Sequence, residues 1–302
     1  MTDSFGRNIN YIRVSLTDRC NLRCRYCMPE KGIDKKSHRD ILSLEDIYEI
    51  IQTAVEMGFS KVRLTGGEPL VRKGVIELCR SISGLSGVKD FAMTTNGLLL
   101  PEMARELKAA GLMRLNISLD TLDPDKYHQI TRIGSLDDAL AGIAAAEEAG
   151  FTNIKLNTVL IGGFNDCEIP RLVELTKQKS YQVRFIELMP IGHTYPFDRE
   201  AYLPMRTVLE RVPELEPVQS DGGVARLYRL PGAKGTVADK PPQRPLLLRL
   251  QQAEAYGGRL PQALPALCRG DTPKGTSRRC AEGADRICRI PQAGAPLRPF
   301  LF

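Results

Sequence analysis

The segment Asn10–Pro29 reads NYIRVSLTDRCNLRCRYCMP, and it joins a predicted β-strand to three closely spaced cysteines. In its first half apolar and polar residues alternate, which is typical of a strand whose two faces meet different surroundings. In its second half Cys20, Cys24 and Cys27 have the spacing C-x3-C-x2-C. Three thiolates can hold three irons of a cubane cluster and leave the fourth iron open to chemistry. The segment therefore predicts an iron–sulfur site.

Two other uses of these cysteines are less consistent with the sequence. A structural zinc site needs four ligands, and no C-x2-C or H-x3-H pair lies near enough to supply the fourth. A disulfide requires an oxidising compartment, but the first residues, Met1–Ser4, show no apolar signal segment. We therefore expect a cluster, in a cytoplasmic protein.

Upstream of Val237 the chain alternates short strand-like runs with amphipathic helical runs. The six predicted pairs are Tyr11–Thr17 with Leu44–Met57, Lys61–Thr65 with Val75–Ile82, Asp90–Thr94 with Glu102–Ala110, Met113–Leu119 with Leu136–Ala149, Asn153–Ile161 with Glu168–Lys177, and Tyr181–Leu188 with Arg206–Val212. A repeated strand-then-helix order is typical of parallel strands joined by crossover helices. The sequence therefore predicts an α/β fold, an incomplete (βα)6 TIM-type barrel. It contains no run of 18 consecutive apolar residues, so we expect no transmembrane helix.

Several predicted strands carry polar residues on one parity, among them Arg13, Arg63, Asn116 and Lys155. A packed barrel fills its centre with branched apolar side chains instead. A solvated sheet face would give the same alternation, but helices that cover the other face make this explanation weaker. Arg13, Arg63, Lys155 and Arg184 would then converge on an anion, and guanidinium groups suit phosphate oxygens. We predict that a nucleotide triphosphate binds there.

The run Gly66-Gly67-Glu68-Pro69 follows the second predicted strand directly. Paired glycines let the backbone approach a ligand closely, and the carboxylate of Glu68 could bind an ammonium group or a ribose hydroxyl. Alone, the four residues could form only a tight turn. Beside the cysteine triplet they become a specific motif.

Together these motifs resemble the radical S-adenosylmethionine (SAM) superfamily and, within it, the family of GTP 3′,8-cyclases of molybdenum cofactor biosynthesis. The resemblance covers about the first 237 residues. It rests on the stretches Asn10–Pro29, Lys61–Leu70, Thr94–Gly97, Arg114–Leu122, Lys155–Phe164, Arg184–Pro190 and the hairpin-like Ala225–Gly232.

The resemblance implies a role for particular residues. It implies that a [4Fe–4S] cluster is bound by Cys20, Cys24 and Cys27, and that SAM chelates the open iron through its amino and carboxylate groups. The positions that match SAM contacts are Tyr26, Gly67, Ser118 and Met189. The positions that match GTP contacts are Arg13, Arg63, Thr94 and Lys155. Arg184 joins the GTP site on strand parity alone.

The resemblance also implies a reaction and its partners. One electron from the cluster cleaves SAM to methionine and a 5′-deoxyadenosyl radical, which abstracts hydrogen from ribose C3′ of GTP. The carbon radical then attacks C8 of guanine to give 3′,8-cyclo-7,8-dihydro-GTP. The protein positions the ribose and excludes water. The implied partners are GTP, an electron donor and a downstream cyclic pyranopterin synthase; a homodimer is compatible with the family, and no membrane partner is expected.

Residues 238–302 differ in composition from the rest of the chain. They hold 11 Lys and Arg against 5 Asp and Glu, whereas residues 1–237 hold 31 of each. They also hold 9 of the 20 prolines and show no sustained helical or strand period. A basic tail could bind nucleic acid, but aromatic residues are nearly absent from it, so we consider nucleic acid an unlikely partner. We predict a domain 1–237 that includes the hairpin, and an aberrant tail 238–302.

The family carries a second cluster, bound by C-x2-C-x13-C after the hairpin, and a Gly-Gly end. Here the downstream cysteines are Cys268, Cys280 and Cys288, spaced by eleven and seven residues, and the sequence ends Arg298–Phe302. With suitable synonymous codons, a one-nucleotide shift across residues 246–266 permits the missing C-x2-C-x13-C. We therefore predict a frameshift just after Val237, either in the gene or in its recorded sequence, with a divergent or disordered tail as the alternative.

This prediction has two consequences for activity. If the recorded sequence is wrong, the protein is an ordinary two-cluster GTP cyclase. If the gene is shifted, the chain is a one-cluster remnant that binds SAM but cannot cyclise GTP.

The remaining cysteines and histidines carry no predicted metal site. Cys79 lies in a predicted amphipathic helix, where a small core residue is expected. Cys167 follows a loop-like stretch and has no partner cysteine nearby. His38, His128 and His193 are scattered without metal-ligand spacing, so we expect surface or structural roles.

Overall fold

A computed structural model describes residues 9–33, 41–189, 197, 199–219, 225–239 and 252–255 of the 302-residue chain. Within these ranges the strands form one sheet of ten, in the order β10-β1-β2-β3-β4-β5-β6-β9-β8-β7. Its central strands are all parallel: β1 (Tyr11–Ser15), β2 (Lys61–Thr65), β3 (Asp90–Thr95), β4 (Arg114–Ser118), β5 (Lys155–Leu160) and β6 (Gln182–Glu187).

The two edges of the sheet are built differently. β9 (Thr236–Asp239) is parallel to β6, and β8 (Arg226–Arg229) and β7 (Glu216–Val218) continue antiparallel from it. β10 (Gln252–Ala255) is parallel to β1 at the other edge. The described strands therefore form an open arc, with no pairing between the two edge strands in this part of the chain.

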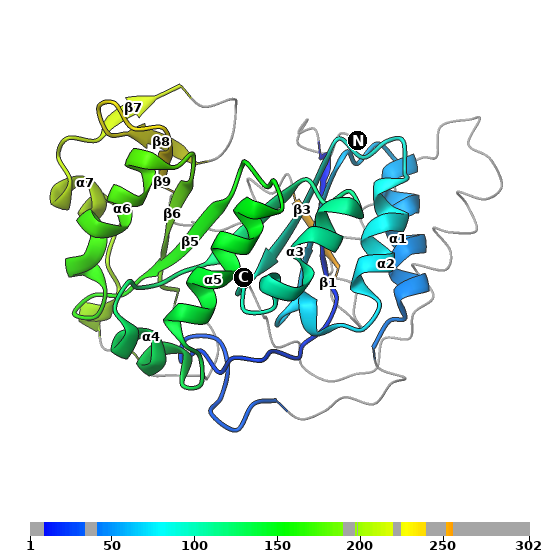
Figure 1. Cartoon of the computed structure of the whole chain (residues 1–302), viewed down its shortest axis with the longest axis horizontal. Coiled ribbons are helices and arrows are strands. Elements are labelled where there is room, and N and C mark those ends of the chain that lie inside the picture. Colours follow the sequence, from blue (N-terminus) through cyan, green and yellow to red (C-terminus); the bar gives the residue numbers. More distant parts are fainter. Residues whose placement is uncertain are drawn as a thin grey trace.

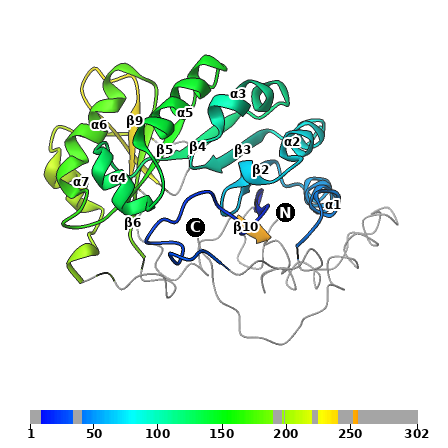
Figure 2. The same cartoon turned by 60° about the horizontal axis from the view of Figure 1, so that its bottom comes forward.

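The helices lie on the outer side of this arc (Figure 2). They are α1 (Leu44–Glu56), α2 (Val75–Ser83), α3 (Leu100–Ala109), α4 (Pro124–Thr131), α5 (Leu136–Glu148), α6 (Ile169–Gln178) and α7 (Arg206–Arg211), with short 3₁₀ helices at Pro69–Val71, Asp166–Glu168 and Arg199–Ala201. Figure 1 shows the same layer along the sheet, from α1 and α2 at one end to α6 and α7 at the other. No helix in the described ranges is long and apolar enough to cross a membrane.

The predicted fold class is confirmed. Each of the six predicted strand–helix pairs is present, and the end residues differ only slightly. The short helix α4 was not predicted. It begins at an Asp123 N-cap, whose side chain accepts from the backbone N–H groups of Asp125 and Lys126, and its apolar residues are too few for a clear helical period.

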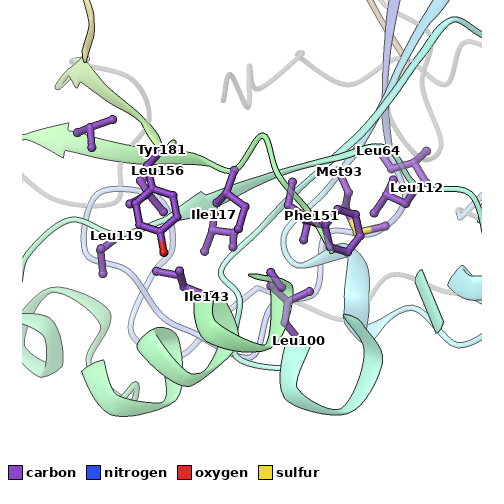
Figure 3. Packing of buried hydrophobic residues seen from close by; sticks show 14 of the residues in the cluster. Leu64, Met93, Leu100, Leu112, Ile117, Leu119, Ile143, Phe151, Leu156 and Tyr181 are labelled. Carbon is purple, nitrogen blue, oxygen red and sulfur yellow. The ribbon is translucent and has the colours of Figure 1, made fainter. Parts of the chain in front are cut away.

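The core lies between the strands and the helix layer. Alternate residues of each strand point into this core, including Leu64, Ile117 and Leu156. Leu100 of α3 and Ile143 of α5 face these strands (Figure 3). Because successive strand residues point to opposite faces, the other parity faces away from the helices. The polar residues identified in the sequence occupy this second face, which we call the inner face.

The chain beyond Val237 is described only in part. β9 crosses the predicted boundary, since it continues through Asp239 and Ala238 is buried in the core. β10 is a further difference, because the sequence showed no sustained strand period there. Four residues are too few to give a period, and the open edge of β1 supplies the hydrogen bonds for such a strand. Residues 240–251 and 256–302, with Cys268, Cys280 and Cys288, lie outside the described residues, as do His38 and His193.

Candidate active site

The chain leaves β1 and runs beside the end of β2 before it reaches the cysteines. The N–H of Leu16 donates to the Thr65 carbonyl (2.8 Å), and the N–H of Gly67 donates to the Thr17 carbonyl (2.7 Å). The N–H of Glu68 then donates to the carbonyl of Arg19 (2.8 Å). These bonds place the segment Cys20–Met28, which we call the cysteine loop, at the carboxyl ends of the parallel strands.

The two glycines are required by this close approach of two backbones. A Cβ added at Gly67 would lie 2.3 Å from the Arg19 carbonyl oxygen, and one at Gly66 would lie 2.6 Å from that of Thr17. Gly66 also has φ +157°, near the edge of the region that non-glycine residues rarely adopt. The structure thus gives a packing reason for both glycines, whatever ligand they also contact.

Glu68 does not present a carboxylate to a ligand, in contrast to the expectation from the sequence. It is 1% exposed. Its Oε1 accepts from the Leu70 N–H (3.1 Å) and the Thr95 hydroxyl (2.7 Å), and its Oε2 accepts from the Asn96 N–H (2.7 Å). Burial raises its pKa to about 7, although these three donors act in the opposite direction. Glu68 therefore ties the ends of β2 and β3 together.

The three predicted cluster ligands are free, half-buried thiols. The Leu22 N–H donates to Cys20 Sγ (3.3 Å), and Asn96 Nδ2 lies 3.8 Å from the same sulfur. Burial, with the nearby Glu68 and Cys24, raises the pKa of Cys20 to about 11. A hydrogen bond with Cys27 and burial raise the pKa of Cys24 as well.

This environment fits a cationic cofactor. A buried thiol that resists ionisation needs a positive partner before it becomes a thiolate ligand, and metal binding supplies that partner. In the described residues no three or more His, Cys, Asp or Glu side chains converge on one metal-ion position. A cubane cluster does not require its ligands to converge on one metal position, because each cysteine binds a different iron.

Tyr26 links the cysteine loop to the end of β4. Its hydroxyl donates to Asp120 Oδ2 (2.6 Å), and Asp120 Oδ1 accepts from the Val159 N–H (2.8 Å). Burial raises the pKa of Asp120 to about 6, and burial together with Asp120 raises that of Tyr26. This hydroxyl is therefore engaged within the protein, and its ring is what the tyrosine could offer a ligand.

The inner face carries a group of cations in neighbouring registers. Arg13 lies opposite Arg63, while Lys155 is flanked by Asn116 and Gln182. Burial lowers the pKa of Arg63, and it lowers that of Arg184 to about 10 with help from the charge of Arg63. Burial, then Arg184 and other arginines, lowers the pKa of Lys155 to about 7. Neighbouring cations whose pKa values are lowered by burial and by one another indicate a site that favours an anionic ligand.

Arg114 is a further cation on this face that the sequence analysis missed. It shares the parity of Asn116 and Ser118, which was the available signal. Its guanidinium binds Asp90 through Nε (2.8 Å) and Nη2. Asp90 is thus engaged directly by Arg114, and its charge also acts on Arg63 and Lys155.

Several polar atoms of the inner face are buried and have no hydrogen-bond partner within the described structure. They are Arg63 Nε, Asn116 Oδ1, Asn157 Oδ1 and Gln182 Oε1. A buried polar group without a partner costs about 1–3 kcal/mol, so such a set is a place where a polar ligand is expected.

The other predicted contact residues lie along the same face. Thr94 Oγ1 accepts from Asn116 Nδ2 (3.2 Å). Ser118 ends β4 beside Asn157 of β5, and Met189 is half-buried just after β6. The strand residues among the predicted SAM and GTP positions therefore lie on one face of the sheet, and the cysteine loop lies at the carboxyl ends of these strands.

Comparison with known proteins identifies the class of the chain. The family described as the radical SAM superfamily matches residues 14–176, more than half of the chain. Streptococcus suis SuiB bound to S-adenosylmethionine has a similar structure, with a TM-score of 0.56 and 19% identity over 68% of this chain and 47% of that one. Methylornithine synthase (PylB) has a TM-score of 0.53 and 16% identity over 80% and 75% of the two chains. The fold and the family match define the class: a radical SAM protein.

Relatives with higher identity specify the family. The GTP 3′,8-cyclase of Peptoclostridium acidaminophilum is 54% identical over 240 residues, which cover 78% of this chain and 74% of the relative. That of Alkaliphilus metalliredigens is 53% identical over 238 residues, with 78% and 74% coverage. The chain belongs to the GTP 3′,8-cyclase family of radical SAM enzymes. Its family implies a [4Fe–4S] cluster and SAM as cofactors.

Proposed function

We propose that this protein converts GTP to 3′,8-cyclo-7,8-dihydro-GTP, the first step of molybdenum cofactor biosynthesis. The observation that carries the proposal is the inner face, where half-buried cations and unpartnered polar atoms of the described residues lie on strands whose carboxyl ends meet the cysteine loop. A triphosphate matches the cations, and the amide oxygens can accept from a guanine or ribose donor. The names of the relatives support the same substrate.

In this proposal Cys20, Cys24 and Cys27 bind the cluster. Cluster and SAM, when bound, supply a radical that can abstract hydrogen from a ribose carbon. The positions proposed for SAM are Tyr26, Gly67, Ser118 and Met189. The positions proposed for GTP are Arg13, Arg63, Thr94, Lys155 and Arg184.

The chain's own residues do three things in this scheme. The cations hold the phosphates, which fixes the ribose at a set distance from the cysteine loop. Glu68 ties the ends of β2 and β3 together, and Asp120 holds the end of β4 against Tyr26 of the cysteine loop. The helix layer seals only the outer face of the sheet, so water is displaced from the inner face by the bound cofactor and nucleotide themselves.

We also propose that residues 1–237 form the catalytic part; in the alternative, residues 238–302 do not supply the second cluster and the chain is a remnant that binds SAM without cyclising GTP. The downstream spacing of Cys268, Cys280 and Cys288 supports this, since it differs from C-x2-C-x13-C. The scheme further requires an electron donor and a synthase that takes the cyclic product, in a cytoplasmic setting.

The test uses the full 302-residue protein. It is reconstituted with iron and sulfide without oxygen, then incubated with SAM, GTP and dithionite, and both 5′-deoxyadenosine and the cyclic nucleotide are measured by mass spectrometry. A variant with Cys20, Cys24 and Cys27 all changed to Ala is the control for cluster-dependent chemistry. GTP-dependent formation of the cyclic nucleotide supports the full activity. Deoxyadenosine without cyclic nucleotide supports the one-cluster remnant, and neither product from a protein with a full cluster contradicts the proposal.

A further inference from the structure

The cysteine loop is fastened to the rest of the protein on two sides. On the side of β3, Asn96 Nδ2 donates to Asn21 Oδ1 (2.7 Å) and lies near Cys20 Sγ. On the other side the loop meets residues Ile130–Gly134, which are the last two residues of α4 and the three that follow it, and which we call the α4 corner. Figure 2 shows the dark blue segment after β1 reaching across the open side of the arc toward α4.

Backbone bonds join the α4 corner to the middle of the loop. The Arg23 N–H donates to the Thr131 carbonyl (3.1 Å), and the Arg25 N–H donates to that of Ile130 (2.9 Å). A Cβ added at Gly134 would lie 2.7 Å from Leu22 Cδ2, so the corner and the loop are in tight contact. The two segments therefore pack as one unit around Cys24.

Arg132 makes the side-chain contact of this unit. Its Nη1 donates to the Arg23 carbonyl (2.6 Å) and to the Met28 carbonyl (3.1 Å). These two carbonyls flank a turn in which the N–H groups of Cys27 and Met28 both donate to the Cys24 carbonyl, at 3.1 and 2.9 Å. One guanidinium thus closes the chain on both sides of two predicted cluster ligands.

The backbone of Arg132 supports a specific role. Its φ is +66° and its ψ is −32°, and within the described ranges it is the one non-glycine residue with positive φ. Such a conformation is unfavourable for a side chain with a Cβ and persists where surrounding contacts require it. Glycine would fit this backbone better but could not reach the two carbonyls.

We propose that Arg132 is a positioning residue that holds the Cys24–Cys27 turn in its cluster-binding shape before the cluster arrives. The inference rests on the proposed function, because it takes these cysteines as cluster ligands. A loop without regular hydrogen bonding must otherwise lose conformational freedom when it binds a cofactor. Arg132 removes part of that freedom in the protein without cofactor, so cluster assembly and retention depend on it.

The test compares R132G with wild type and with I133A in the full-length protein. Ile133 is the next residue and is 58% exposed, so I133A changes the same corner on its solvent side. In the protein without cluster, amide hydrogen exchange of the cysteine loop is measured by mass spectrometry together with the melting temperature. After reconstitution, iron and sulfide per chain, the visible absorbance of the cluster and its rate of loss to a chelator are measured.

We expect R132G to melt near the wild-type temperature, because glycine adopts the positive φ without strain and this gain offsets the two lost side-chain hydrogen bonds. We expect its loop amides to exchange about tenfold faster and its cluster to be lost about tenfold faster, while I133A matches wild type in both. The R132K variant keeps the charge but not the planar fork, so it should fall between R132G and wild type. If R132G does not fold, R132K is judged by the same measurements.

Two results separate failure of this inference from failure of the proposed function. If R132G, or R132K in its place, matches wild type in loop exchange and cluster retention, the positioning role is refuted. The C24A variant tests the cluster assignment itself. If C24A binds as much iron and sulfide as wild type, Cys24 is not a ligand and the proposed function fails at that point.

Discussion

Lys155 gives a pH-dependent prediction that can be worked out quantitatively. Burial, followed by the charges of Arg184, Arg114 and Arg63, lowers its pKa from 10.5 to about 7. Without ligand the amine is therefore about half protonated at pH 7 and mostly neutral at pH 9. A bound triphosphate adds negative charge beside the amine and raises its pKa again. GTP binding should therefore take up a proton above pH 7.

The size of the effect follows from the pKa. If the amine stays protonated in the complex up to pH 9, the dissociation constant for GTP should rise by about 50-fold between pH 7 and pH 9. The terminal phosphate is mostly ionised above pH 7, and ionisation of guanine N1 near pH 9 is common to the wild type and K155R, so the difference between the two proteins isolates Lys155. At pH 7 about half a proton should be taken up per GTP bound.

Isothermal titration in buffers of different ionisation enthalpy measures both quantities. K155R is the matched control, because its guanidinium stays charged and its affinity should be nearly independent of pH from 7 to 9. R184M removes the cation that lowers the Lys155 pKa most, so the pH dependence should begin at higher pH. Equal GTP affinity of the wild type at pH 7 and pH 9, or the same slope in K155R, would refute the reasoning.

The same pKa shift fixes the sign of a stability effect without ligand. Between about pH 7 and 10.5 the unfolded chain binds more protons at Lys155 than the folded protein does. The contribution of this residue to stability therefore rises with pH across that window and is most unfavourable below pH 7.

Three further substitutions test the supports of the site. G67A should lower the melting temperature and the iron content, because its Cβ would meet the Arg19 carbonyl, whereas G84A, with 3.4 Å to its nearest atom, should behave as wild type. E68Q should lower the free energy of unfolding by about 2 kcal/mol in urea denaturation. The carboxylate oxygens now accept three hydrogen bonds, and the amide nitrogen of Gln would replace one of these acceptors with a donor; an unchanged urea midpoint would contradict this. C79A should keep the full iron content and lose only about 1–2 kcal/mol of stability, since Cys79 is buried in α2 and is not a predicted cluster ligand; a lower iron content than wild type would contradict this.

Much of the fold follows from local sequence patterns. The six strand–helix pairs were predictable because apolar period and strand alternation are properties of short segments. Strand alternation also predicted which residues face away from the helix layer, since this alternation is fixed by backbone geometry. The cysteine spacing is local as well, so the cluster prediction needed no tertiary information.

Other features were decided by contacts between distant segments. The local sequence around Glu68 cannot distinguish a carboxylate that contacts a ligand from one that is bonded within the protein. The hydrogen bonds from Thr95 and Asn96, some 27 residues away, decide this orientation. The helix α4 was too short to show a helical period in the sequence. Its role depends on the hydrogen bonds between its last residues and the cysteine loop, which only the tertiary structure shows.

The difference has a physical reason. The sequence by itself determined the elements, the parity of their side chains and the chemistry of the cysteine segment, because each depends on neighbours within a few residues. Only the tertiary structure decided how charge and hydrogen bonds are shared, because both depend on burial and on which strand ends meet. The lowered pKa of Lys155 and the two carbonyls bound by Arg132 exist only once β4, β5, α4 and the cysteine loop are brought together.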